Sequence, residues 1–134
     1  MAEFTGQNMV IQWINSGGTT TLSGDYRKID LPFAKDLVES TAGSDAGRTD
    51  IATLWNYTVA YGGVMQTGGT AVEDALLPGT SGTLIVGPEG TATGKRKYTI
   101  PCMSLGATFA VQYDQVVEMA CNFKSQGAPT LAVY

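Results

Sequence analysis

Alternation of apolar and polar side chains over residues 109–124 constrains this chain more than any other feature of its sequence. The odd positions are mostly apolar: Phe109, Val111, Tyr113, Gln115, Val117, Met119, Cys121 and Phe123. Most even positions are polar: Gln112, Asp114, Glu118, Asn122 and Lys124. A period of two is typical of a β-strand with one packed and one solvated face. The pattern therefore predicts a strand over 109–124, much longer than the usual ~5–6 residues.

Shorter stretches of the same kind predict further strands. They cover residues 9–14, 19–22, 26–33, 51–61, 83–86, 96–105 and 130–134. Gly17 and Gly18 predict a hairpin turn between the first two of these strands. Pro101 cannot donate to a strand ladder, so it marks an edge or a bulge in the strand over 96–105.

Only one helix is indicated by the sequence. Thr70 and Glu73 have the spacing of a capping box, and Pro78-Gly79 ends the segment after about two turns. The fold class expected from these elements is all-β, an antiparallel sandwich or barrel with one short flanking α-helix. With 134 residues the chain is expected to form a single domain, 1–134.

Several enzyme classes are excluded by composition and spacing. The chain has no histidine, which rules out a His-containing catalytic triad, a histidine general base and a His-bearing zinc site. The glycine-rich stretch 87–97 carries Glu89 and Arg96 where a phosphate loop needs Gly and Ser or Thr. On one strand, Asp114 and Glu118 would lie about 13 Å apart, beyond the ~5–9.5 Å of paired glycosidase carboxylates. We therefore expect no enzyme activity, no cofactor and no metal.

The cysteines and the N-terminus suggest a chain that is neither exported nor membrane-bound. Cys102 and Cys121 lie 19 positions apart and match no Cys-x-x-Cys motif. The N-terminus shows no signal-peptide pattern, and no apolar run approaches the ~20 residues that span a bilayer. Since disulfides are rare in proteins that are not exported, we expect two reduced, buried thiols.

Two polar segments suggest contacts with partners. Residues 34–50 have little periodicity and predict a loop longer than the ~12–15 residues common in compact domains. Leu37 and Val38 at its base favour a loop that orders against a partner over a free surface loop. The basic run Lys95, Arg96 and Lys97 suits the acidic residues of another subunit better than nucleic acid, because the net charge is −4. Only 15% of residues are charged, against a usual ~25%, which also suggests a surface covered by partners.

The order of these segments resembles a known family. An N-terminal hairpin is followed by the polar loop Val38-Glu39-Ser40-Thr41-Ala42-Gly43-Ser44-Asp45-Ala46-Gly47-Arg48, an aromatic strand and a short capped helix. Then come the phrase Gly-Pro-Glu-Gly-Thr-Ala-Thr-Gly-Lys at 87–95 and alternating strands. Together they resemble the tail tube (major tail) proteins of long-tailed bacteriophages.

The resemblance implies a structural role in the virion tail, for a protein made in the host cytoplasm. Six copies of such a protein form a ring, each subunit gives strands to a continuous inner β-barrel, and stacked rings make a conduit for DNA. The implied partners are the protein itself, tail tip or baseplate and terminator proteins, a tape measure protein in the lumen, and DNA in transit without specific binding. No membrane is implied.

The resemblance also places roles on residues. The lumen-facing candidates are Gln112, Asp114, Glu118 and Asn122. The ring-stacking candidates are Glu39, Thr41, Gly43, Ser44, Asp45 and Arg48, and the segments 1–8 and 125–134 are candidate arms. Lys95, Arg96 and Lys97 are candidates for contacts between subunits. Six copies at −4 each would carry −24 per ring, and an acidic lining would repel DNA phosphates, although Lys124 departs from it.

Two other classes of protein fit the same residues. One is another ring-forming virion component, such as a head–tail joining or decoration protein. The other is a monomeric β-barrel that binds a small ligand among Trp55, Tyr57 and Tyr61, although aromatics on one strand face more often belong to an ordinary core. The polar face of the 109–124 strand could equally face the outer solvent.

Overall fold

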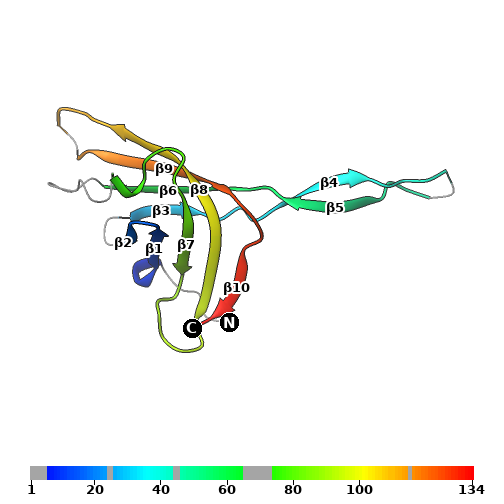
Figure 1. Cartoon of the computed structure of the whole chain (residues 1–134), viewed down its shortest axis with the longest axis horizontal. Coiled ribbons are helices and arrows are strands. Elements are labelled where there is room, and N and C mark those ends of the chain that lie inside the picture. The colour runs from blue at the N-terminus through cyan, green and yellow to red at the C-terminus, as the bar shows by residue number, and fades with distance from the viewer. Residues whose placement is uncertain (1–5, 24–25, 44–45, 65–73, 115) are drawn as a thin grey trace.

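The structure is a computed structural model that describes residues 6–23, 26–43, 46–64, 74–114 and 116–134 (Figure 1). It consists almost entirely of antiparallel strands. The elements are η1 (Gly6–Asn8), β1 (Val10–Asn15), β2 (Gly18–Thr21), β3 (Tyr26–Asp30), β4 (Lys35–Glu39), β5 (Asp50–Trp55), β6 (Thr58–Val64), β7 (Ser81–Gly87), β8 (Arg96–Ala110), β9 (Glu118–Ser125) and β10 (Thr130–Val133). The all-β fold class predicted from the sequence is confirmed.

Eight of the strands form one sheet, and β4 and β5 form a separate pair. The large sheet has the order β2-β1-β7-β8-β9-β6-β3, and β10 adds to β8. All of its pairs are antiparallel. Figure 1 shows β6 and β9 running across the direction of β7 and β10, so the sheet is strongly bent.

Contacts across the sheet show that it folds into a two-layer sandwich. Trp13 on β1 and Phe123 on β9 are separated by β7 and β8, yet their ring centroids lie 4.9 Å apart. In a flat sheet three strand spacings would separate them by about 14 Å. The Tyr61 hydroxyl on β6 donates to the Leu22 carbonyl, 2.9 Å away, and joins the layers at a second point. The buried side chains between them are Ile11, Trp13, Leu22, Tyr57, Val59, Tyr61, Leu76, Leu84, Val86, Ile100, Cys102, Met119, Cys121 and Phe123.

The fifteen-residue strand β8 makes the bend, because its two halves belong to different layers. Its first half pairs with β7 and β10, and its second half pairs with β9. The register shifts between Ser104 and Ala107, where Gly106 has a φ of 102° that favours glycine. Pro101 lies between the end of the β10 ladder and the start of the β9 ladder. The N–H that Pro101 lacks therefore falls at the gap between the β10 and β9 ladders, in line with the interruption predicted from the sequence.

The continuous strand predicted over 109–124 is wrong. The chain reverses between β8 and β9, so that Phe109 pairs with Met119 and Ala110 with Glu118. Alternation runs through the reversal because Val111, Tyr113 and Val117 continue the apolar set within the connection. Burial follows the predicted period only in β9, where Met119, Cys121 and Phe123 are buried.

Two further segments differ from the expectation. The strand predicted over 51–61 is interrupted at residues 56 and 57, and its halves β5 and β6 belong to different sheets. The segment 34–50 is a hairpin built from β4 and the start of β5 rather than a loop, and it projects far from the sandwich (Figure 1). A projecting hairpin has no packed face, so its sequence shows little hydrophobic period.

The predicted helix is only partly covered by the described residues. Asp74 and Ala75 are helical, and Leu76, which follows them, is 1% exposed in the core. The expected capping residues Thr70 and Glu73 lie outside the described residues. No helix in the described part of the chain is long and apolar enough to cross a membrane.

Candidate assembly and lining surfaces

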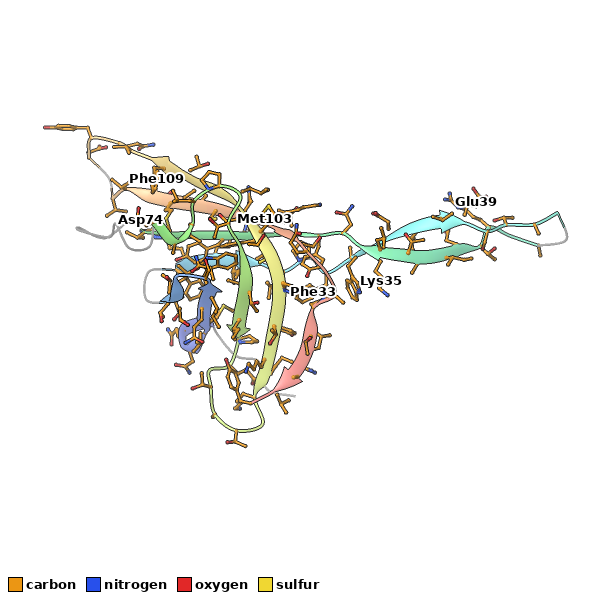
Figure 2. The ribbon with its side chains drawn as sticks, viewed as in Figure 1. Phe33, Lys35, Glu39, Asp74, Met103 and Phe109 are labelled. Carbon is orange, nitrogen blue, oxygen red and sulfur yellow. The ribbon has the colours of Figure 1, made fainter. Side chains whose placement is uncertain are left out.

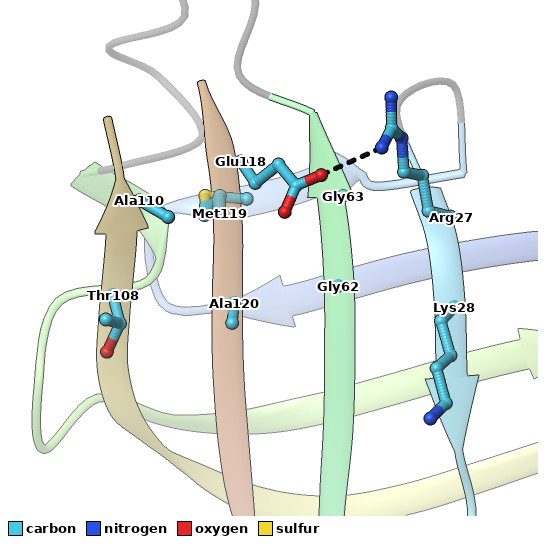
Figure 3. A pocket seen from close by; sticks show the side chains of 9 residues that line it. All are labelled: Arg27, Lys28, Gly62, Gly63, Thr108, Ala110, Glu118, Met119 and Ala120. Carbon is cyan, nitrogen blue, oxygen red and sulfur yellow. Dashed lines mark hydrogen bonds and ion pairs between the residues drawn. The ribbon is translucent and has the colours of Figure 1, made fainter. Parts of the chain in front are cut away.

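One layer of the sandwich presents a broad, solvated sheet face. It consists of β3, β6, β9 and the second half of β8. In β6 and β9 every second residue points into the core and the others point outward. In β3 a bulge between Tyr26 and Lys28 leaves both Arg27 and Lys28 on the outward face (Figure 3). One row across the outward face runs Thr108, Ala120, Gly62 and Lys28, and small side chains at its centre leave an open pocket (Figure 3).

An ion pair crosses this face. Arg27 Nη1 on β3 lies 2.8 Å from Glu118 Oε1 on β9, and the two side chains meet above β6 (Figure 3). Gly62 and Gly63 provide no side chain at the crossing point. Both partners remain about half exposed to solvent.

The outward face is not the acidic surface expected from β9 alone. Lys28 pairs with Asp30 at 3.4 Å, and Lys124 Nζ donates to Asn56 Oδ1. Among the described residues of the face, Arg27, Lys28 and Lys124 are cationic, while Asp30 and Glu118 are anionic. Its formal charge is therefore +1 per subunit, and each cation has an acceptor beside it.

The four lumen-facing candidates fall in two places. Glu118 and Asn122 lie on the outward face of β9, as expected. Gln112 and Asp114 lie in the connection between β8 and β9 and are exposed. The same connection carries three exposed apolar side chains, Val111, Tyr113 and Val116.

The four-stranded layer has an open edge on each side. On one side, β3 pairs with β6 and with no other described strand. On the other side β8 pairs with β9 beyond Ser104, while the last β7 partner is Met103. In the described part of the chain no strand covers either edge, so backbone groups of β3 and of residues 107–110 are left for another strand.

The β4–β5 hairpin, called the arm below, exposes apolar side chains along its length. Leu37 is 64% exposed and Leu54 is 74% exposed, and Val38 and Ile51 pair with each other while more than half exposed. Hydrogen bonds join the two sides of the arm: Thr53 Oγ1 donates to the Asp36 carbonyl, and Ser40 N donates to the Thr49 carbonyl. A two-stranded hairpin without packing is marginal in water.

The ring-stacking candidates lie on the outer part of the arm. Glu39 ends β4, and Thr41 Oγ1 accepts a hydrogen bond of 2.8 Å from Thr49 N. Arg48 Nε lies 3.2 Å from Asp50 Oδ1, and Gly43 is exposed near the tip. Ser44 and Asp45 lie outside the described residues.

Aromatic side chains join the arm to the sandwich. Phe33 lies 5.5 Å from Tyr57 and 5.6 Å from Tyr98, measured between ring centroids. Trp55 at the end of β5 meets Tyr57 edge-on at 6.3 Å, and Lys35 Nζ lies 4.8 Å from the Trp55 ring centroid. Figure 2 shows Phe33 and Lys35 at this junction.

The aromatics considered as a ligand site are used for packing. The Tyr57 hydroxyl donates to the Gly127 carbonyl at 3.1 Å, and burial, with a smaller contribution from Cys102, raises the pKa of Tyr57 to about 12. Tyr61 is buried and joins the layers as described above. In the described ranges no three His, Cys, Asp or Glu side chains come close enough to hold a metal ion.

The two cysteines are free and buried within the core. Burial raises the pKa of Cys102 to about 12 and also raises the pKa of Cys121. Ser104 Oγ lies 3.5 Å from Cys121 Sγ and donates to the Leu76 carbonyl. Such thiols are structural rather than reactive.

The basic run does not form a single patch. Lys95 faces Glu89 at 3.8 Å, and Lys97 Nζ lies 5.2 Å from the Tyr134 ring centroid. Arg96 begins β8 and pairs with Val133 of β10. The C-terminal segment is held there as an edge strand, since Tyr134 N donates to the Lys95 carbonyl and its own carbonyl accepts from Gly94 N.

Comparison with known proteins identifies the fold. No protein-family model and no curated protein sequence matches this chain. Among solved structures, the tail of an empty gene transfer agent particle refined with C6 symmetry is similar at a TM-score of 0.77 and 14% identity, covering 98% of this chain and 100% of that one. The SPP1 tail tube is similar at 0.72 and 10% identity, covering 98% and 80%. The sheath–tube complex of an extracellular contractile injection system is similar at 0.69 and 7% identity, covering 98% and 93%.

Proposed function

We propose that this chain is a tail tube subunit, a structural and non-catalytic protein that assembles into stacked rings in a virion tail. The observation that carries the proposal is the four-stranded layer, whose edges at β3 and at the second half of β8 have no partner among the described strands. The similarity of nearly the whole chain to tail and tube structures supports it.

Two different open edges favour a ring. Pairing β3 of one copy with residues 107–110 of the next uses unlike surfaces, and such head-to-tail contacts close into a ring when the rotation between copies allows it. Six copies of four strands, spaced by ~4.8 Å, give a circumference of about 115 Å and a diameter of about 37 Å before strand tilt widens it. Closure would leave no strand edge exposed.

The outward face of this layer then lines the lumen, with Glu118 and Asn122 on it. Gln112 and Asp114 lie at its rim, in the connection from β8 to β9. DNA passes without specific binding because the face carries a formal charge of only +1 per subunit. The tape measure protein before ejection, and the tip and terminator proteins at the ends, are the further partners proposed.

The arm stacks one ring on the next. Burial of its exposed leucines against a neighbouring ring would be favourable. Because the arm projects from the sandwich, it would bring Glu39, Thr41, Gly43, Ser44, Asp45 and Arg48 to that ring. Lys95, Arg96 and Lys97 at the far end of the sandwich are proposed to meet acidic groups of a neighbouring copy. Each ring would therefore be bound to the next by six arms.

The first test is negative-stain electron microscopy of the purified protein over a concentration series, with light scattering of the same samples. We expect hollow tubes or six-fold rings. A matched variant replaces residues 42–48 by two glycines, and it should form rings that do not stack into long tubes. A wild-type protein that stays monomeric at every concentration, even with tail-tip proteins added, would contradict the proposal.

A further inference from the structure

The Arg27–Glu118 pair holds a cation over the centre of the outward face. To meet, the two side chains span β6, a distance of two strand spacings or about 9.6 Å. The glycines of β6 and Ala120 beneath them leave that path clear (Figure 3). The pair therefore lies above the floor of the pocket rather than at its border.

Glu118 decides the charge of this face. With it, three cations face two carboxylates. Without it, Arg27 would lose its partner at 2.8 Å, and the formal charge would rise from +1 to +2 per subunit. In a ring of six the change is from +6 to +12. Guanidinium groups bind phosphate through paired hydrogen bonds, so freed arginines would face the DNA backbone.

We propose that Glu118 is a built-in counter-ion that keeps Arg27 from holding DNA phosphates, so that the lining releases the duplex it conducts. The inference rests on the tail tube function proposed above. Glu118 takes one N–H donor of Arg27 and places a negative charge beside the guanidinium, so a phosphate that approaches Arg27 meets a weaker attraction. Lys28 is paired in the same way with Asp30, whereas Lys124 donates to the neutral amide of Asn56 and keeps its full charge.

The test uses tubes assembled from wild-type protein and from Glu118→Gln, mixed with a fluorescent duplex DNA and collected by sedimentation over a salt series. We expect Glu118→Gln tubes to retain at least about tenfold more DNA at 50 mM salt. If two more phosphates are neutralised, the slope of log affinity against log salt should steepen by about 1.8. The double variant Arg27→Gln/Glu118→Gln should return to wild-type retention.

Asp74→Asn is the matched control, because it makes the same change of net charge at an exposed carboxylate that lies neither on the outward face nor on the arm. It should not raise retention. Asn122→Lys adds a cation to the outward face and leaves the Arg27–Glu118 pair intact, so it should also raise DNA retention. This variant replaces Glu118→Gln in the test if Glu118→Gln does not assemble. Tubes of either lining variant that retain no more DNA than wild type would overturn the inference. A failure of the tail tube function itself would show differently, as wild-type protein that forms no tubes.

Discussion

Replacing Leu37 and Leu54 by serine should leave the subunit folded and prevent it from forming tubes. Both leucines lie on the arm, and most of each side chain is exposed in the single subunit. Full burial of a leucine side chain is worth about 1.5–3 kcal/mol. The quarter to third already buried accounts for only about 0.4–1 kcal/mol of subunit stability per residue.

Assembly should be affected far more than stability. Covering the exposed part of each leucine on a neighbouring ring is worth about 1–2 kcal/mol, so the double variant loses about 2–4 kcal/mol per subunit. Since 1.4 kcal/mol is a factor of ten, the critical concentration for tube growth should rise about 30- to 700-fold. Sedimentation of tubes over a concentration series measures this value, and thermal unfolding of the monomer measures stability.

Leu131→Ser is the matched control. This leucine is 55% exposed, but it lies on β10, which pairs with β8 and not with either strand of the arm. It should leave the critical concentration close to wild type. The reasoning would be refuted if the double arm variant formed tubes at the wild-type concentration, or if its monomer melted as a core variant does.

Two further predictions concern the junction and the core. Phe33→Ala should loosen the arm by removing its contacts with Tyr57 and Tyr98, so spin labels on arm and sandwich should show a broader distance distribution, which Phe33→Tyr restores. The raised pKa of Cys102 makes alkaline pH destabilising: the folded state holds the thiol proton above pH 9.0, where the unfolded state releases it, so stability falls as pH rises towards 12. From pH 7.5 to 10 wild type should lose about 1.4 kcal/mol more than Cys102→Ala in denaturant titrations, and equal losses would argue against the buried thiol as the cause.

The strands could be predicted from the sequence because burial of one sheet face makes apolar residues recur at every second position. Met119, Cys121 and Phe123 are buried as that period predicts. The reversal between Ala110 and Glu118 was not predicted, because the connecting residues contain neither glycine nor proline and most of them continue the alternation. The two strands of the arm were not predicted as a hairpin either, since a hairpin that is exposed on both faces shows no alternation of apolar and polar residues.

The sequence by itself determined the all-β class, the buried face of β9, the interruption of strand pairing at Pro101 and the absence of histidine chemistry. These are local properties, decided by a residue and its near neighbours. Only the tertiary structure decided that Arg27 reaches Glu118, 91 positions away, across the two glycines of β6. It also decided that two unlike sheet edges have no partner strand in the described part of the chain. Strand order and the bend in β8 arise from packing between distant segments, and no short pattern records which strand will lie beside which.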